Sequence, residues 1–176
     1  MAFETTSPWL VTFTYCPGNF TLAIDVKSGK SLLFKSPSHT HFYGHGAFSS
    51  DGNLLFAIEN RFEIGEGLIV IYDATDSFSC IAEIPSHGIG PHKTVLMPDG
   101  HILCVANGGI ATHTDTRRVK LNIPEMQSSV VFIDSRHGDP VAKFDMPQRM
   151  RLLSLRHMAI DHEGKVWIGG QYEGDE

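Results

Sequence analysis

The sequence predicts an all-β fold, a β-propeller fragment of about three four-stranded antiparallel blades, from three observations. Segments beginning near His45, His92 and Arg156 align, each running through an apolar stretch, a turn glycine and a second apolar stretch. A second unit, marked by Asp25, Asp73 and Asp134, interleaves with the first at the same period. Val, Ile, Leu and Phe fill short runs between turn signals, without helical periodicity. Four short strands per repeat of about 40–50 residues are typical of propeller blades.

The repeat divides the chain into four successive parts. These are the outer strands of one blade at 8–36, a full blade at 44–84, a full blade at 91–145, and the inner strands of the next at 156–172. Closed propellers have about four to eight blades, and an open array leaves strand edges unpaired. We therefore expect a piece of a longer propeller, completed by the missing blades of the parent chain; self-association is the alternative.

One connection within the repeat is longer than its counterparts. The turn glycines Gly52, Gly100 and Gly164 lie 48 and 64 residues apart, and the 16 additional residues (64 − 48) fall within the loop 108–127. This loop carries His113, Arg117 and Lys120, a locally basic group on an acidic protein. Long loops in compact domains are often functional, so we expect a lid or a partner-binding loop, with a plain insertion as the alternative.

Composition excludes several classes of protein. The 14 Lys and Arg against 20 Asp and Glu give a net charge of −6, and no basic run suggests a nucleic-acid partner. No apolar stretch approaches the roughly 18 residues of a membrane span. The first ten residues lack the basic start and apolar core of a signal peptide. The three cysteines are too far apart for a disulfide framework or a zinc knuckle.

Several motifs also carry a family resemblance: FYGHGAFSSDGNLLFAIEN, GIGPHKTVLMPDG, VANGGIATH, RRVKLN and RHMAIDHEGKVWIGGQYEG. From about Pro17 onward the chain resembles the bacterial family known as domain of unknown function 1513 (DUF1513). The resemblance implies a seven-bladed parent of the YVTN/WD40-like type, exported to the periplasm by a twin-arginine signal. It further implies a periplasmic iron-uptake partner, because genes for iron uptake or imelysin-like proteins often lie nearby. The signal is missing here, so a cytoplasmic location is the alternative.

Three repeat-equivalent histidines form the candidate metal site. His45, His92 and His157 each begin the innermost strand of a blade, where a propeller places side chains around its central channel. Imidazole suits iron and copper, and the family setting favours iron. His41, in the cluster HTHFYGH, is expected to reach the same face. The alternative is that each histidine bonds the backbone of its neighbouring blade and holds no metal.

Other polar residues are expected to line the histidine face as binding residues. They end the second strands, lie in the long loop or adjoin His157: Glu59, Asn60, Asn107, His113, Arg117, Lys120, Arg156 and Gln171. The alternative for Asn and Glu is that they cap turns and satisfy loop backbone groups.

Three functions remain open at this point. The first is a metal-linked (iron or copper) binding or uptake-accessory protein. The second is a propeller enzyme of lactonase or oxidoreductase type, although no GxSxG, P-loop, HExxH or dinucleotide motif is present and no catalytic residue can be named. The third is an interaction scaffold that docks a partner through the loop 108–127. Propellers support all three, so the fold alone does not choose.

Overall fold

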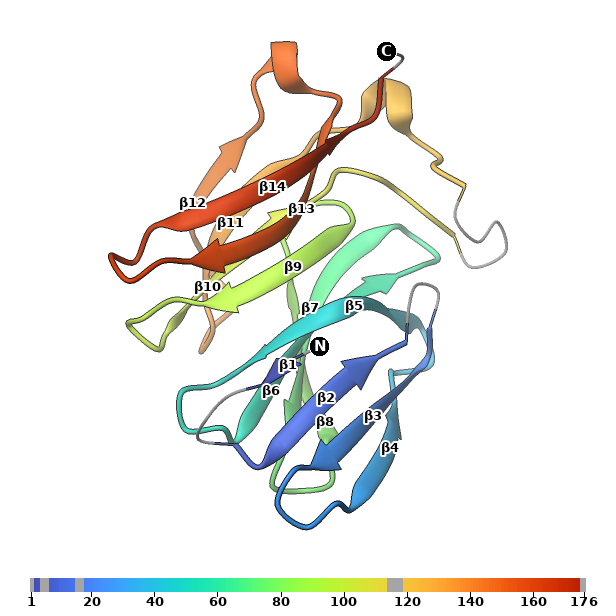
Figure 1. Cartoon of the computed structure of the whole chain (residues 1–176). Helices are drawn as coiled ribbons and strands as arrows, with labels where there is room; N and C mark the ends of the chain where they lie inside the picture. Colours follow the sequence, from blue (N-terminus) through green and yellow to red (C-terminus); the bar gives the residue numbers. More distant parts are fainter. Residues whose placement is uncertain (1, 4–6, 15–17, 114–118, 175–176) are drawn as a thin grey trace.

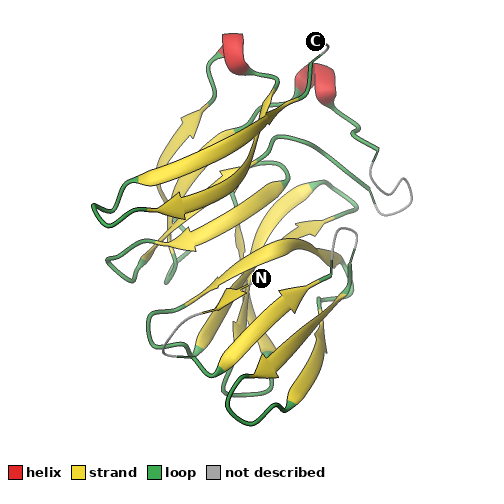
Figure 2. Ribbon diagram, in the orientation of Figure 1, coloured by secondary structure: helices red, strands yellow, loops and turns green. Residues whose placement is uncertain are grey.

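The computed structural model describes residues 2–3, 7–14, 18–113 and 119–174 (Figure 1). Nearly all regular structure is β, as expected, and the strands form four antiparallel sheets (Figure 2). Within the described ranges, the helical elements are two 3-10 turns, η2 (Ile123–Glu125) and η3 (Gln148–Met150). No helix in this part of the chain is long and apolar enough to span a bilayer.

Each sheet is built from strands that follow one another along the chain. Sheet 1 contains β1 (Ala2–Phe3), β2 (Trp9–Phe13), β3 (Phe20–Asp25) and β4 (Ser31–Lys35). Sheet 2 contains β5 (Thr40–Phe48), β6 (Leu54–Arg61), β7 (Glu66–Asp73) and β8 (Ser79–Pro85). Sheet 3 contains β9 (Pro91–Leu96), β10 (Ile102–Asn107), β11 (Ser129–Asp134) and β12 (Pro140–Asp145). Sheet 4 consists of β13 (Leu153–Ile160) and β14 (Val166–Tyr172).

The first strands of sheets 2, 3 and 4 lie next to one another. β5 packs beside β9, and β9 packs beside β13, while β1 and β2 approach β5 from sheet 1 (Figure 1). This is the arrangement of propeller blades, whose innermost strands face a common axis. The short β1 precedes the strands that the repeat predicted, and it gives sheet 1 a fourth strand.

The core lies in layers between successive sheets. Along β6, Leu55 and Ala57 pack toward sheet 1, whereas Phe56 on the opposite face packs toward sheet 3. A strand buried on both faces requires a continuous apolar run, which is why LLFAI does not alternate with polar residues. The next layer, around Cys104 and Met158, joins sheet 3 to sheet 4. Successive sheets are therefore held together by side-chain packing.

Aspartate-glycine turns join the strands at the positions that the repeat predicted. Gly52 has φ +74°, and the Asp51 carboxylate accepts a hydrogen bond from the Asn53 backbone N–H at 3.1 Å. Glycine supplies the positive φ without steric cost, while the aspartate holds the turn. The turn at Asp99 and Gly100 is built in the same way: Gly100 has a positive φ, and the Asp99 carboxylate accepts a hydrogen bond from the His101 backbone N–H.

Candidate metal centre

The innermost strands are irregular where they carry the three histidines. The pairing of β5 with β6 shifts register across the segment that contains His45, and Gly44 there has φ +98°. The pairing of β9 with β10 shifts at His92, and that of β13 with β14 shifts directly before His157. A β-bulge turns a side chain away from the direction that a regular strand would give it. Three separate sheets thus use the same device at the same position.

The structure brings His45, His92 and His157 together. One ring nitrogen from each lies within 4.8 Å of the others. The ring centroids form a nearly equilateral triangle, with sides of 5.5 Å, 5.7 Å and 5.2 Å. These residues come from β5, β9 and β13, so the cluster spans three sheets.

Two of these rings are held in the neutral form. Burial, followed by nearby positive charges that include Lys93, lowers the pKa of His45 to about 3. Burial and the charge of Arg156 lower the pKa of His92 to about 4. His157 is exposed and opens the cluster to solvent. A neutral imidazole keeps the nitrogen lone pair that a metal ion needs.

A hydrogen bond from the neighbouring sheet orients His92. Its Nδ1 lies 2.9 Å from the backbone oxygen of Arg156, which can only accept, so Nδ1 carries the proton and Nε2 keeps the lone pair. This is the bond to a neighbouring blade that the non-metal alternative requires. Among the described residues, however, neither His45 nor His157 makes such a bond. A hydrogen bond to the backbone of the neighbouring blade therefore explains His92 but not the other two histidines.

The cluster fits a small metal ion after a modest adjustment. Metal–nitrogen bonds of about 2.1 Å in tetrahedral geometry place ligand nitrogens about 3.4 Å apart. The widest separation in the cluster is 4.8 Å, so closure requires ring movements of roughly an ångström. The exposed His157 can supply much of that movement by side-chain rotation.

Arg156, Lys120 and Glu173 form an ion-paired group beside the histidines. Arg156 donates from Nη2 to Glu173 Oε1 at 2.8 Å, and Lys120 from the long loop donates to Glu173 Oε2. The side chain of Glu173 is 3% exposed. The sequence placed Arg156 and Lys120 on this face, together with the end of the last strand, and Glu173, the carboxylate that joins them, directly follows β14.

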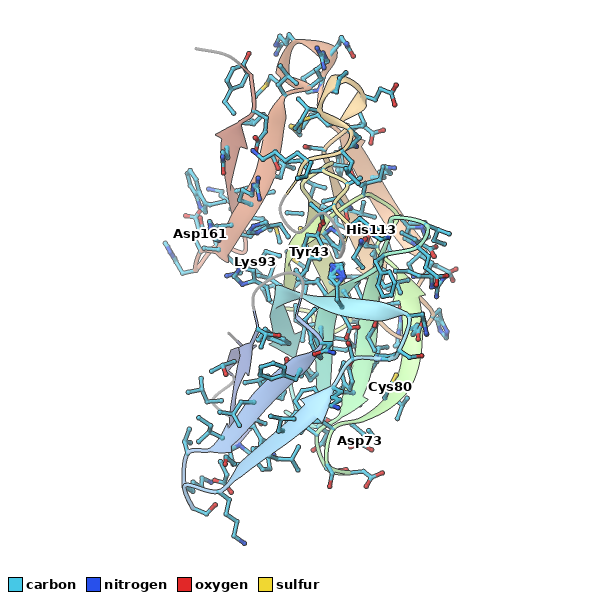
Figure 3. All side chains as sticks on the ribbon, turned by 90° about the vertical axis from the view of Figure 1, so that its right-hand side faces the viewer. Tyr43, Asp73, Cys80, Lys93, His113 and Asp161 are labelled. Carbon is cyan, nitrogen blue, oxygen red and sulfur yellow. The ribbon has the colours of Figure 1, made fainter. Side chains whose placement is uncertain are left out.

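His41 belongs to a different cluster from the three histidines. His41 is 2% exposed, and its ring stacks on Tyr43 and Phe62, with centroid distances of 5.4 Å and 6.1 Å. The ring of His113 also contacts Phe62, with a centroid distance of 6.0 Å, and the Tyr43 hydroxyl hydrogen-bonds the Thr112 hydroxyl at 2.6 Å. Figure 3 shows Tyr43 and His113 near each other. Burial and the neighbouring His113 lower the pKa of His41 to about 4. This aromatic contact attaches the long loop to β5.

Glu59 lies in the core and does not line the histidine face. It is 0% exposed, and its two oxygens accept hydrogen bonds from Thr40 and Tyr72, the latter at 2.5 Å. Burial raises the pKa of Glu59 to about 7. Burial and the adjacent carboxyl also raise the pKa of Tyr72 above its ordinary value. With both oxygens bonded inside the core, Glu59 is unsuited to bind a ligand.

The remaining predicted binding residues are dispersed. Asn60 and Asn107 are buried, and in each the side-chain oxygen has no hydrogen-bond partner among the residues that the structure describes. Asn107 donates a hydrogen bond to the Ser86 carbonyl at 3.1 Å. It thus bonds a loop backbone group, which is the structural role that we named as the alternative to ligand binding. Gln171 is exposed on β14, and Arg117 lies outside the described residues.

The fold and the site define a class: a β-propeller segment with a three-histidine cluster across three consecutive blades. The family model described as protein of unknown function, DUF1513, matches residues 1–176, and the chain belongs to this family. A comparison with curated proteins finds no match.

Two solved structures are similar in fold. One is an acylaminoacyl peptidase in complex with Z-Gly-Gly-Phe-chloromethyl ketone, 12% identical, with a TM-score of 0.59 over 95% of this chain and 27% of that one. The other is Kuenenia stuttgartiensis hydrazine synthase, 14% identical, with a TM-score of 0.49 over 97% of this chain and 55% of that one. The chain thus spans about a quarter and about half of these proteins. The first similarity concerns the fold alone.

Proposed function

We propose that this protein binds a first-row transition-metal ion, iron or copper, through His45, His92 and His157. The convergence of one ring nitrogen from each of three sheets within 4.8 Å carries the proposal. Two further features support it: buried rings that stay neutral, and a backbone carbonyl that takes the Nδ1 proton of His92 and so leaves Nε2 with its lone pair. In this proposal the protein is a metal-linked binding or uptake-accessory protein of the periplasm, with an iron-uptake protein as its partner.

The three imidazole ligands favour iron or copper as the bound ion. Three imidazoles suit both metals, and divalent copper binds nitrogen ligands more tightly than iron does. A set of three protein ligands leaves coordination positions open, so the ion remains accessible for exchange or delivery. Glu59, the carboxyl group with the clearly raised pKa, has both oxygens bonded in the core. The enzyme alternative thus gains no acid–base pair from it.

Metal analysis of matched variants tests the proposal. The protein and a variant with His45, His92 and His157 all changed to Ala are each equilibrated with iron and with copper, then desalted and analysed for metal. A control variant changes three exposed turn histidines, His101, His137 and His162, to Ala. We expect about one ion per chain in the protein and the control, and none in the cluster variant. Equal metal content in both variants, with unchanged far-UV spectra, would refute the site.

A further inference from the structure

We propose that the three-histidine site takes its metal ion together with a small oxyanion or carboxylate, which binds the ion and accepts a hydrogen bond from Arg156. This inference rests on the proposed metal site and adds the chemical class of a second ligand. It follows from the charge around the cluster, from an unpartnered donor beside it, and from the coordination that three histidines leave open.

The surroundings of the cluster are positively charged. Lys93 follows His92, Arg156 precedes His157, and Lys120 reaches the same group through Glu173. Three cations and one carboxylate give this group a net charge of +2. Among the described residues, the side chain of Lys93 forms no ion pair or hydrogen bond.

The ligand group itself cannot offset a metal charge. Within the described part of the chain it consists of three histidines and contains no carboxylate. A metal ion would therefore add positive charge to a place that is already positive, and like charges repel strongly where burial reduces solvent screening. A bound anion removes that penalty.

Arg156 provides a donor that lacks an acceptor. Its Nη2 bonds Glu173, but its Nε is buried and has no hydrogen-bond partner in the described part of the chain. Leaving a buried donor unsatisfied is costly, most of all on a charged group. The backbone oxygen of the same residue lies 2.9 Å from His92, so Arg156 adjoins the cluster. An oxyanion bound to the ion would have a second oxygen to accept this N–H.

A metal ion bound by three histidines also has an open coordination position for the anion. Three protein ligands leave at least one position on a tetrahedral ion for an outside group. The exposed His157 lies on the side from which solvent enters. Arginine is well suited to hold carboxylates and other oxyanions, because its planar donors match their geometry. The site therefore favours an ion carrying an anionic oxygen ligand over a bare or hydrated ion.

Anion titration of the copper-loaded protein tests the inference. Copper(II) is bound first, and azide is then added, since its coordination to copper(II) produces a charge-transfer absorption band. Acetate and phosphate are added as competitors that should remove this band. The test variants are Arg156→Gln and Lys93→Gln, and the matched controls are the exposed Arg149→Gln and Lys165→Gln.

Both test variants should weaken anion binding, and Lys93→Gln should have the opposite effect on the copper-binding step. We expect about tenfold weaker azide binding in Arg156→Gln and Lys93→Gln, the usual loss when a charge-assisted contact is removed. Without any anion, Lys93→Gln should bind copper as tightly as the unmodified protein or more tightly, because a repelling charge is gone. A merely structural role for Lys93 would weaken both steps together.

The outcomes separate the two proposals. If copper binds but azide gives no band, or gives equal affinities in test and control variants, the anion inference is overturned and the metal site stands. If no metal binds to the correctly folded protein, the metal site is refuted and the anion inference with it.

Discussion

Replacing Glu59 with glutamine should remove one component of the pH dependence of stability. The carboxyl group is buried between sheets 1 and 2, where it accepts hydrogen bonds from Thr40 and Tyr72. Burial raises the pKa of Glu59 from 4.5 to about 7 in the folded protein. Glutamine keeps the size of the protonated carboxyl but does not titrate. Both neighbouring hydroxyl groups can rotate to meet an amide, so the packing is preserved.

The direction of this pH dependence follows from whether the folded or the unfolded protein binds the Glu59 proton more tightly. Between pH 4.5 and about pH 7 the folded protein keeps the Glu59 proton while the unfolded chain has lost it. Stability from this group is therefore full below pH 4.5 and declines as the pH rises to about 7. A shift of about 2.5 pH units corresponds to a loss of about 3 kcal/mol in the free energy of unfolding.

Urea unfolding at pH 4, 6 and 8 measures this effect. The difference in unfolding free energy between Glu59→Gln and the unmodified protein should change by about 3 kcal/mol in favour of the variant as the pH rises. The subtraction removes the contributions of His45 and His92, which act in the opposite direction at low pH. Glu63→Gln, at an exposed position, is the control. Parallel curves for Glu59→Gln and the unmodified protein would contradict a raised pKa.

Two further substitutions test the bulges and the layered core. In Gly44→Ala the new Cβ meets no atom of the described residues within 4 Å, but φ +98° is strained for any residue with a side chain. The substitution should cost about 1–3 kcal/mol by urea unfolding and reduce metal affinity through the adjacent His45. Unchanged stability would show that the bulge relaxes freely. Leu103→Ala creates a cavity at a fully buried position between sheets 2 and 3. It should lower the free energy of unfolding by about 2–5 kcal/mol in the same assay. A loss below about 1 kcal/mol would argue against close packing there.

The fold was predictable because its signals are local. Asp51-Gly52 and Asp99-Gly100 define turns through the φ that glycine allows and the hydrogen bonds that aspartate makes, and both operate within a few residues. Their recurrence at one period then revealed the blades. The short β1 escaped prediction because two residues are too few to carry a hydrophobic pattern.

The site was predictable only in part, and Glu59 shows why. Repeat equivalence was enough to bring His45, His92 and His157 together, since equivalent positions in neighbouring blades face the same axis. Glu59 shares the face of Leu55 and Ala57, but β6 is buried on both faces, so alternation along this strand did not separate a core position from one on the histidine face.

Two other features lay beyond sequence reasoning because they are tertiary. The pairing of Lys120 with Glu173 joins a loop to the end of another sheet, and no spacing rule connects them. The separation of His41 from the other histidines depends on the bulge that follows it in β5. Local sequence does not determine how far a bulge rotates a strand. It also does not determine which distant loop packs against that strand.

The sheets of this protein are held to one another by packing, whereas the histidine triangle would hold them by bonds. An ion seated on His45, His92 and His157 would act as a staple across sheets 2, 3 and 4. Saturation at a hundred times the dissociation constant would add about 2.7 kcal/mol to the folded state. It would also oblige three separately hydrogen-bonded sheets to come apart in one step, so loading the ion would sharpen the unfolding transition as well as raise its midpoint.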